Sequence, residues 1–167
     1  MVLSHAAGNC FLTLNAKRYT LKAMLIGEYR HTIDAKKRLS VPAKFRKELG
    51  KKIVIAQGLD NCLFVYSEKG WRTFSEKLRA LPMGQAAMRK FNRAMSSGAM
   101  DAEIDALGRI LLPDFLKSFA GLKNKVVFIG VNDRAEIWSE EAWDAYKKQA
   151  EKDVDSLAEK LGEIGAV

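Results

Sequence analysis

The stretch DAKKRLSVP, residues 34–42, returns in altered form 71 residues later as DALGRILLP, residues 105–113. Asp, Arg and Pro occupy the same positions in both stretches, and an aliphatic residue follows each Arg. A second pair of stretches, residues 58–71 and 130–143, matches at an offset of 72 and shares Gly, Ser, Glu and Trp. Because both matches occur in the same order along the chain, we interpret the sequence as a duplicated unit.

Each unit predicts the same series of elements. An extended segment leads into a loop that begins at Asp, and a short strand follows at the Arg. A Pro then opens a short helix, at the position where its missing N–H has no helical partner. Two further strands and a helix capped by Ser complete the unit. The expected elements are 25–33, 38–41, 43–49, 52–57 and 62–66 in the first unit, and about 99–104, 109–112, 114–120, 125–130 and 135–138 in the second.

The repeat divides the chain into five segments. Residues 1–23 fit neither unit, and we interpret them as a disordered extension or as the product of a mis-assigned start; a transit peptide is a third reading. The two units cover residues 24–81 and 98–146, and a Met- and Ala-rich segment between them, residues 82–97, is expected to form a packing helix that joins the units. Residues 147–167 form a C-terminal helical tail, whose apolar stripe predicts packing against another subunit.

The charge of the chain is unevenly distributed. The 167 residues are 48% hydrophobic and carry a net charge of +8, and no apolar run is long enough to predict a membrane-spanning helix. Residues 24–97 hold 16 Lys and Arg against 6 Asp and Glu, a net charge of +10, whereas residues 98–167 have a net charge of −5. The first half therefore predicts a surface for a polyanion such as nucleic acid, with a solvated basic face as the alternative.

The Asp-x-x-x-Arg loops contain the candidate site residues. Arg can bind a guanine edge through two parallel donors, whereas Lys neutralises phosphate as a point charge. Asp34 and Asp105 are predicted to shape the loops, since an Asp carboxylate accepts backbone N–H groups two residues further on. The predicted DNA-binding set is Arg38 for base reading, Lys36, Lys37, Lys44 and Arg46 for phosphate, and, as weaker candidates, Arg30 and Arg109, the latter because its loop neighbours are neutral.

The chain lacks the residue patterns that a metal site, a phosphate-binding loop or a catalytic site would need. The chain has two Cys and two His without metal-ligand spacing, and it has no phosphate-binding glycine-rich loop. An acid pair formed by Asp34 and Asp105 is the enzymatic alternative, but no nucleophile or base accompanies it. We therefore expect a protein that is not an enzyme and that uses no cofactor, metal or small-molecule substrate.

The segments GEYRHTIDAKKRLSVPAKFRKELG (residues 27–50) and LGRILLPDFL (residues 107–116) resemble the MraZ family of bacterial transcriptional regulators, and the resemblance covers about residues 24–146. It implies a mixed β fold with short α-helices, an AbrB-like swapped-hairpin β-barrel in which two repeats replace two subunits, followed by a C-terminal helix. It also implies a ring-shaped homo-oligomer that binds double-stranded DNA at short G-rich boxes upstream of its own gene. Such a protein is expected to be cytoplasmic and nucleoid-associated, to repress its own division and cell-wall gene cluster, and to use the Arg of the first loop, Arg38, as the key contact.

One position departs from the family pattern. The first loop usually has Gly before the Arg, where this chain has Lys37, while the second loop retains Gly108. If the position requires a left-handed backbone, Lys costs roughly 1–2 kcal/mol there; Lys37 could instead add a phosphate contact. Two other functions remain open. One is an antitoxin-like protein of the same fold with a toxin partner, against which the internal repeat argues. The other is a structural ring protein whose basic half contacts RNA or an acidic protein.

Overall fold

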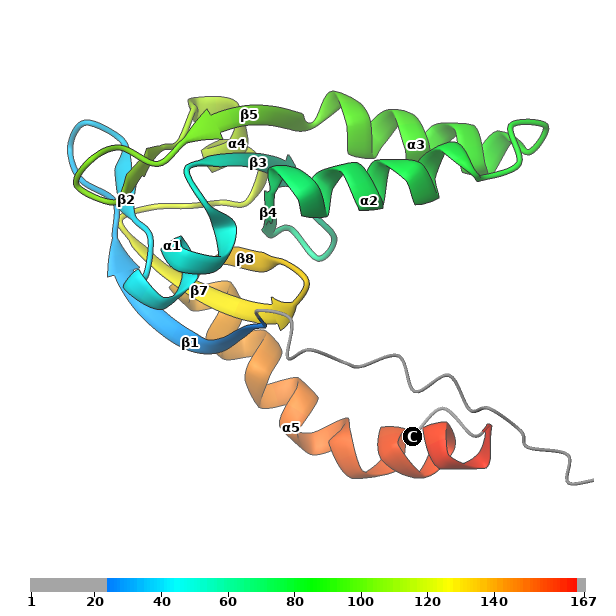
Figure 1. The fold of residues 1–167 in the computed structure, drawn as a ribbon. Coiled ribbons are helices and arrows are strands. Elements are labelled where there is room, and N and C mark those ends of the chain that lie inside the picture. The colour runs from blue at the N-terminus through cyan, green and yellow to red at the C-terminus, as the bar shows by residue number, and fades with distance from the viewer. Residues whose placement is uncertain (1–23, 165–167) are drawn as a thin grey trace, which may run out of the picture.

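The computed structural model describes residues 24–164, which form two sheets and five helices (Figure 1). The first half of the chain contributes β1 (Leu25–Thr32), β2 (Arg38–Ser40), α1 (Ala43–Leu49), β3 (Lys52–Gln57), β4 (Leu63–Ser67) and α2 (Glu68–Arg79). After α3 (Ala86–Ser97), the second half contributes β5 (Ala99–Glu103), β6 (Arg109–Leu111), α4 (Asp114–Phe119), β7 (Lys125–Asn132), β8 (Ala135–Ser139) and α5 (Glu140–Glu163). The element order predicted from the repeat is therefore correct, with ends that differ by one or two residues.

The two halves exchange their first strands. The six-stranded sheet has the order β1-β7-β8-β4-β3-β5, so β1 of the first half pairs with β7 of the second, and β5 of the second half pairs with β3 of the first. Both pairings are antiparallel, and β4 and β8 join the halves at the centre of the sheet. When each strand is replaced by its counterpart in the other half, the result is the same order read from the opposite edge of the sheet. The halves are thus interlocked around an approximate two-fold axis.

The strands do not close into a barrel. Within residues 24–164, β1 and β5 are the two edges of the large sheet, and the remaining strands, β2 and β6, pair with each other in a separate two-stranded sheet. The antiparallel sheets, the short helices and the C-terminal helix agree with the predicted mixed β fold, but a closed barrel is not found among these residues. The exchange of strands accounts for the interlocking without closure.

Local signals set the ends of the helices. Pro42 and Pro113 precede α1 and α4 as N-cap residues, one position earlier than predicted. Gly50 follows α1 with a φ of 76°, and Gly121 has a φ of 57° just after α4, in the left-handed region that Gly tolerates. The Ser67 hydroxyl accepts a hydrogen bond from the backbone N–H of Gly70, and Ser139 caps α5 in the same way.

The hydrophobic core has two parts. The larger part fills the space between the sheets and the short helices, and its most deeply buried aromatic residues are Phe45 and Phe128. The smaller part lies on the other face of β4, β7 and β8, and Trp71 and Trp143 pack against it from α2 and α5. The Trp that both repeats share therefore packs against the core in each half.

Two helical features extend from the sheet (Figure 1). Helices α2 and α3 form a hairpin in which Leu78 and Met95 are buried while Phe91 remains partly exposed. The predicted connecting helix lies beside α2, where the Asn92 side chain donates a hydrogen bond to the carbonyl of Leu78, and it also contacts β3. The distal part of α5 leaves its apolar stripe exposed at Val154, Leu157, Leu161 and Ile164. None of the helices within residues 24–164 is both long and apolar enough to cross a membrane.

Candidate nucleic-acid interface

The two Asp-x-x-x-Arg loops have the same internal geometry. In the first loop, Asp34 Oδ1 accepts hydrogen bonds from the backbone N–H groups of Lys36 (2.8 Å) and Arg38 (2.9 Å). In the second loop, Asp105 Oδ1 accepts from the corresponding N–H groups of Leu107 and Arg109, both at 2.9 Å. Each loop is also closed by backbone hydrogen bonds between its Asp and its Arg. One carboxylate oxygen per loop therefore fixes the turn.

The second oxygen of each carboxylate orients the arginine. Asp34 Oδ2 lies 2.8 Å from Arg38 Nε and 2.7 Å from Arg38 Nη2, and Asp105 Oδ2 binds Arg109 through the same two nitrogens at 2.9 and 2.8 Å. Within residues 24–164, neither arginine donates from Nη1 to a protein acceptor. Each guanidinium is therefore held along one edge, while the edge formed by Nη1 and Nη2 remains available to a ligand.

These contacts lower the pKa of both carboxyl groups. The Arg38 side chain, aided by the backbone N–H groups, lowers the pKa of Asp34 to about 2. The Arg109 side chain lowers the pKa of Asp105 in the same direction. Both carboxylates are therefore charged at neutral pH, and each loop retains its turn and its oriented arginine.

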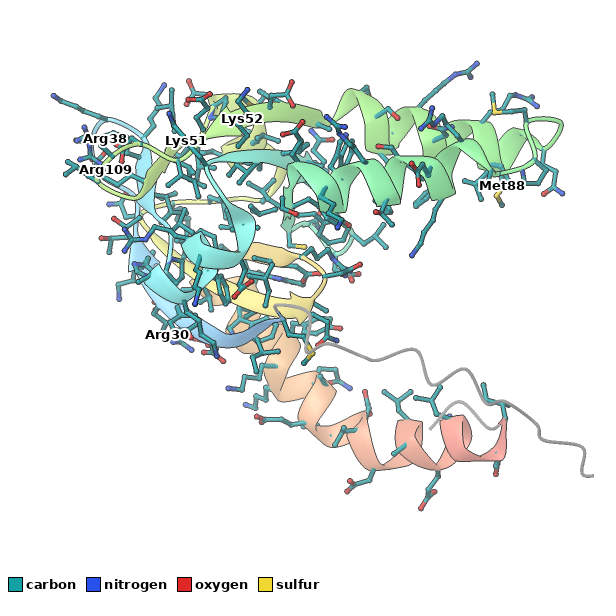
Figure 2. The ribbon with its side chains drawn as sticks, in the orientation of Figure 1. Arg30, Arg38, Lys51, Lys52, Met88 and Arg109 are labelled. Carbon is teal, nitrogen blue, oxygen red and sulfur yellow. The ribbon has the colours of Figure 1, made fainter. Side chains whose placement is uncertain are left out.

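Pairing of β2 with β6 brings the two arginines together. Leu39 and Ile110 face each other in this pair and are buried, so the alternate residues lie on the opposite, outer face. Arg38 pairs directly with Leu111, which makes Arg109 its diagonal neighbour on the same face. The Cα atoms of diagonal neighbours across an antiparallel pair are roughly 7–8 Å apart. Figure 2 shows both arginines at this end of the molecule.

The strand exchange also moves the helices to the opposite loops. Arg46, on α1 of the first half, lies across Gly108 in the second loop, where a Cβ atom would be only 2.6 Å from Arg46 Cζ. An open groove beside this loop is lined by both Arg46 and Lys51. The prediction that Arg109 is the weaker arginine rested on neutral neighbours in sequence. In space, Arg46 and Lys51 of the first half also line this groove, together with Glu103 and Asp105 of the second.

The first loop has a different neighbour. Lys37 has a φ of 60°, so the position does require a left-handed backbone, as Gly108 does with a φ of 77°. Lys37 Nζ lies 2.6 Å from Asp114 Oδ2 at the start of α4. Lys36 and Lys44 are exposed. Asp114 was not among the predicted site residues, although the alignment of the repeats places this acid opposite Ala43 of the first half.

Arg30 lies apart from the loops (Figure 2). Its guanidinium donates to Asp144 at 2.6 Å and to Glu140 and Glu28 at 3.1 Å. These carboxylates, Asp144 first among them, raise the pKa of Arg30. With three acidic partners, Arg30 joins β1 to α5 and offers little free charge to a phosphate.

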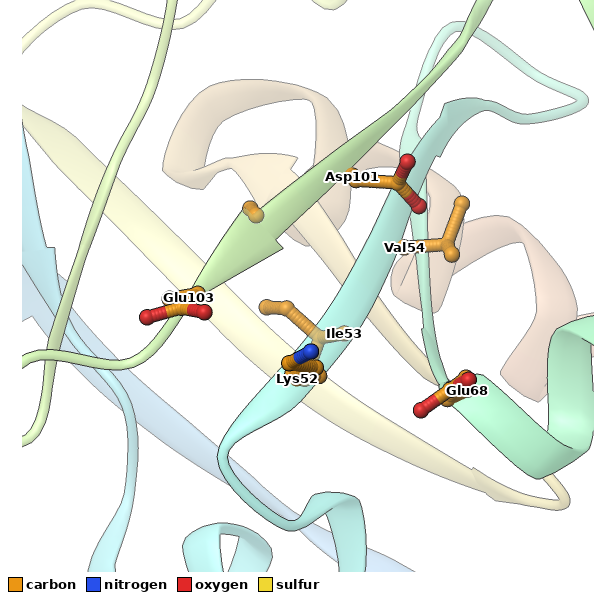
Figure 3. Close-up of a pocket in the computed structure, with 7 residues that line it drawn as sticks. Lys52, Ile53, Val54, Glu68, Asp101 and Glu103 are labelled. Atoms are coloured by element: carbon orange, nitrogen blue, oxygen red, sulfur yellow. The ribbon is translucent and has the colours of Figure 1, made fainter.

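Two further clusters do not resemble a nucleic-acid site. Figure 3 shows a groove along β3 and β5 where Glu68, Asp101 and Glu103 surround Lys52, and three carboxylates disfavour phosphate there. Within residues 24–164, no three or more His, Cys, Asp or Glu residues are arranged to hold a metal ion.

In the smaller core, Glu136 binds Arg134 at 2.8 Å and Trp138 at 3.1 Å, and burial raises the pKa of the neighbouring Cys62 thiol. This cluster serves packing.

Fold and loops together define a protein of two interlocked repeats that presents a pair of carboxylate-braced arginines on one β-ribbon. A family model described as "MraZ protein, putative antitoxin-like" matches the chain twice, over residues 24–94 and 95–162. Three relatives carry the name "Transcriptional regulator MraZ". The protein from Caldanaerobacter subterraneus subsp. tengcongensis is 49% identical over 138 residues, which cover 83% of this chain and 96% of the relative. The proteins from Moorella thermoacetica and a Thermoanaerobacter species are 51% and 48% identical, cover 83% and 84% of this chain, and are themselves covered to 96% and 99%. The chain therefore belongs to the MraZ family.

Proposed function

We propose that this protein is a DNA-binding transcriptional regulator that reads base edges with Arg38 and Arg109. The observation that supports this most directly is the pair of arginines on the outer face of the β2–β6 ribbon. A two-stranded ribbon fits the major groove of B-DNA, where an Arg binds guanine O6 and N7 through two parallel donors. The bracing carboxylates leave the required edge of each guanidinium free. Membership of a family whose relatives are named transcriptional regulators supports the same proposal.

The spacing of the arginines indicates what one ribbon reads. A separation of roughly 7–8 Å corresponds to about two base-pair steps at 3.4 Å per step. One ribbon therefore contacts a short box, for which guanines are the preferred bases, in agreement with the G-rich boxes that the family resemblance implies. Lys36, Lys44 and Arg46 are exposed around the ribbon and are assigned to phosphate. Lys37 joins them once it separates from Asp114.

A box of this length cannot select one site in a genome, so several ribbons must act together. Linked binding events raise avidity by 10²–10⁴ without new contacts when the geometry permits. We therefore propose a ring-shaped homo-oligomer that binds repeated boxes upstream of its own gene and represses the division and cell-wall cluster there, in the cytoplasm and associated with the nucleoid. The exposed apolar stripe of α5 is available for contacts between subunits.

The test is a binding titration of the full chain with a labelled duplex from its own upstream region and with a scrambled duplex of equal length. We expect the upstream duplex to bind at least tenfold more tightly at physiological salt, and Arg38→Ala to abolish the preference while the protein stays folded. Equal affinity for both duplexes would refute sequence-specific binding. Failure to bind either would favour an antitoxin-like or structural role.

A further inference from the structure

Lys37 and Asp114 form an ion pair at the edge of the proposed DNA interface. Lys37 Nζ and Asp114 Oδ2 are 2.6 Å apart, and the two side chains are 48% and 70% exposed. The pair connects the first loop to α4 of the other repeat, and a backbone hydrogen bond from Leu112 N–H to the carbonyl of Lys37 joins the same two segments. Lys37 is thus fixed in position next to a carboxylate that faces the same solvent.

The equivalent place in the second loop has neither charge. By the repeat alignment, Lys37 corresponds to Gly108 and Asp114 corresponds to Ala43. The first loop therefore carries an added cation together with an added anion. An extra phosphate contact would need only the cation, so the anion requires a separate explanation.

The ion pair is easily exchanged for a phosphate. Exposed Lys–carboxylate pairs are weak because water and salt screen them, and Lys is a flexible point-charge donor that accepts phosphate in place of carboxylate. Lys117, one turn along α4, adds positive charge near Asp114, and the pKa of Asp114 is lowered, first by the hydrogen bond from Lys37. Asp114 therefore stays charged and repels an approaching phosphate for as long as it remains at the interface.

We propose that Asp114 competes with DNA phosphate for Lys37 and thereby holds down the affinity of the first loop for duplex DNA. The inference rests on the proposed function, since it assumes that the first loop faces DNA. Phosphate contacts carry no sequence information. Asp114 therefore sets the strength of binding and its salt dependence, while the choice of box remains with the arginines.

The experiment compares four full-length proteins: the natural chain, Asp114→Ala, Lys37→Gly, and the double variant, which gives the first loop the same residue pair as the second. A duplex from the chain's own upstream region and a scrambled duplex are titrated at several salt concentrations. Asp114→Ala removes a negative charge close to phosphate. It should tighten binding of both duplexes by about threefold to tenfold at low salt. The slope of log K against log[salt] should become more negative by about 0.9, because Lys37 then neutralises one more phosphate.

Two comparisons keep the test specific. Glu76→Ala changes the net charge by the same amount at an exposed position of α2, outside the loops and outside the apolar stripe of α5, and should leave binding unchanged. In the Lys37→Gly background, Asp114→Ala should yield a smaller gain and no change in slope. An equal gain in affinity from Asp114→Ala in both backgrounds, or no gain in the natural chain, would refute the competition between Asp114 and phosphate for Lys37. If the natural chain binds neither duplex, the proposed function fails instead, and thermal unfolding of each variant confirms that the fold is retained.

Discussion

Replacing Gly108 with Ala introduces a single methyl group where the two repeats interlock. Gly108 has a φ of 77°, in the left-handed region, and its carbonyl accepts a hydrogen bond from Val41 N–H of the first half. An added Cβ would overlap the guanidinium of Arg46, with Arg46 Cζ at 2.6 Å. The substitution therefore strains the loop backbone and displaces a cation from the second loop.

The two effects differ in size and in readout. A non-glycine residue in the left-handed region costs roughly 1–2 kcal/mol, which lowers the melting temperature by about 2–8 °C for a chain of this size. Displacement of Arg46 costs little stability, because the end of a long side chain can move. Gly108→Ala should weaken DNA binding by the same factor as Arg46→Ala, because each substitution removes the Arg46 cation from its place beside Arg109.

Thermal unfolding and duplex titration together separate these effects. Gly84→Ala is the matched control, since nothing lies within 4 Å of its added Cβ. In an Arg46→Ala background, Gly108→Ala should still lower the melting temperature but should cause no further loss of binding. An unchanged melting temperature for Gly108→Ala would show that the backbone is not strained there. A further loss of binding in the Arg46→Ala background would show that Gly108 does not act through Arg46.

Three further predictions concern the arginines, the DNA and the loop carboxylate. Arg38→Ala should lose roughly 1–3 kcal/mol of specific binding per loop engaged, and Arg109→Ala somewhat less, because the second loop has Leu107 where the first has Lys36; a larger loss for Arg109 by the same titration would reverse the ranking. Inserting about five base pairs between two boxes should weaken binding nearly as much as deleting a box, while about ten should be tolerated, because the helical repeat is about 10–10.5 base pairs; equal affinity for all spacings would exclude a role for the ring. The Asp34 carboxyl should titrate with a pKa of about 2 by NMR and return toward its ordinary value in Arg38→Ala. Since folding lowers this pKa, the interactions of the Asp34 carboxylate contribute their full stability above about pH 4 and lose it as the pH falls toward 2. An Asp34 titration midpoint near pH 4 in the natural chain would contradict the hydrogen bonds to this carboxylate.

The local features of this protein could be predicted from the amino-acid sequence. The offset of 71 residues between the two Asp-x-x-x-Arg stretches predicted the element order and the turn at each Asp. Ser67 and Ser139 predicted the starts of their helices. These features depend on residues only a few positions apart, and their hydrogen bonds and backbone angles are therefore encoded where they occur.

The contacts between residues of different halves follow from the three-dimensional fold and not from the sequence. Arg46 follows Arg38 closely in sequence, yet it lies over Gly108, and Asp114 follows Arg109 closely, yet it binds Lys37. Both placements follow from the pairing of β2 with β6, which continues as hydrogen bonds from Val41 N–H to the Gly108 carbonyl and from Leu112 N–H to the Lys37 carbonyl and so brings each short helix to the other half's loop. An alternating apolar pattern shows that a segment forms a strand, but it does not identify the partner strand, because pairing depends on packing across the whole core. The charge of each half could therefore be counted from the sequence, whereas the loop to which each charge belongs could be read only from the fold.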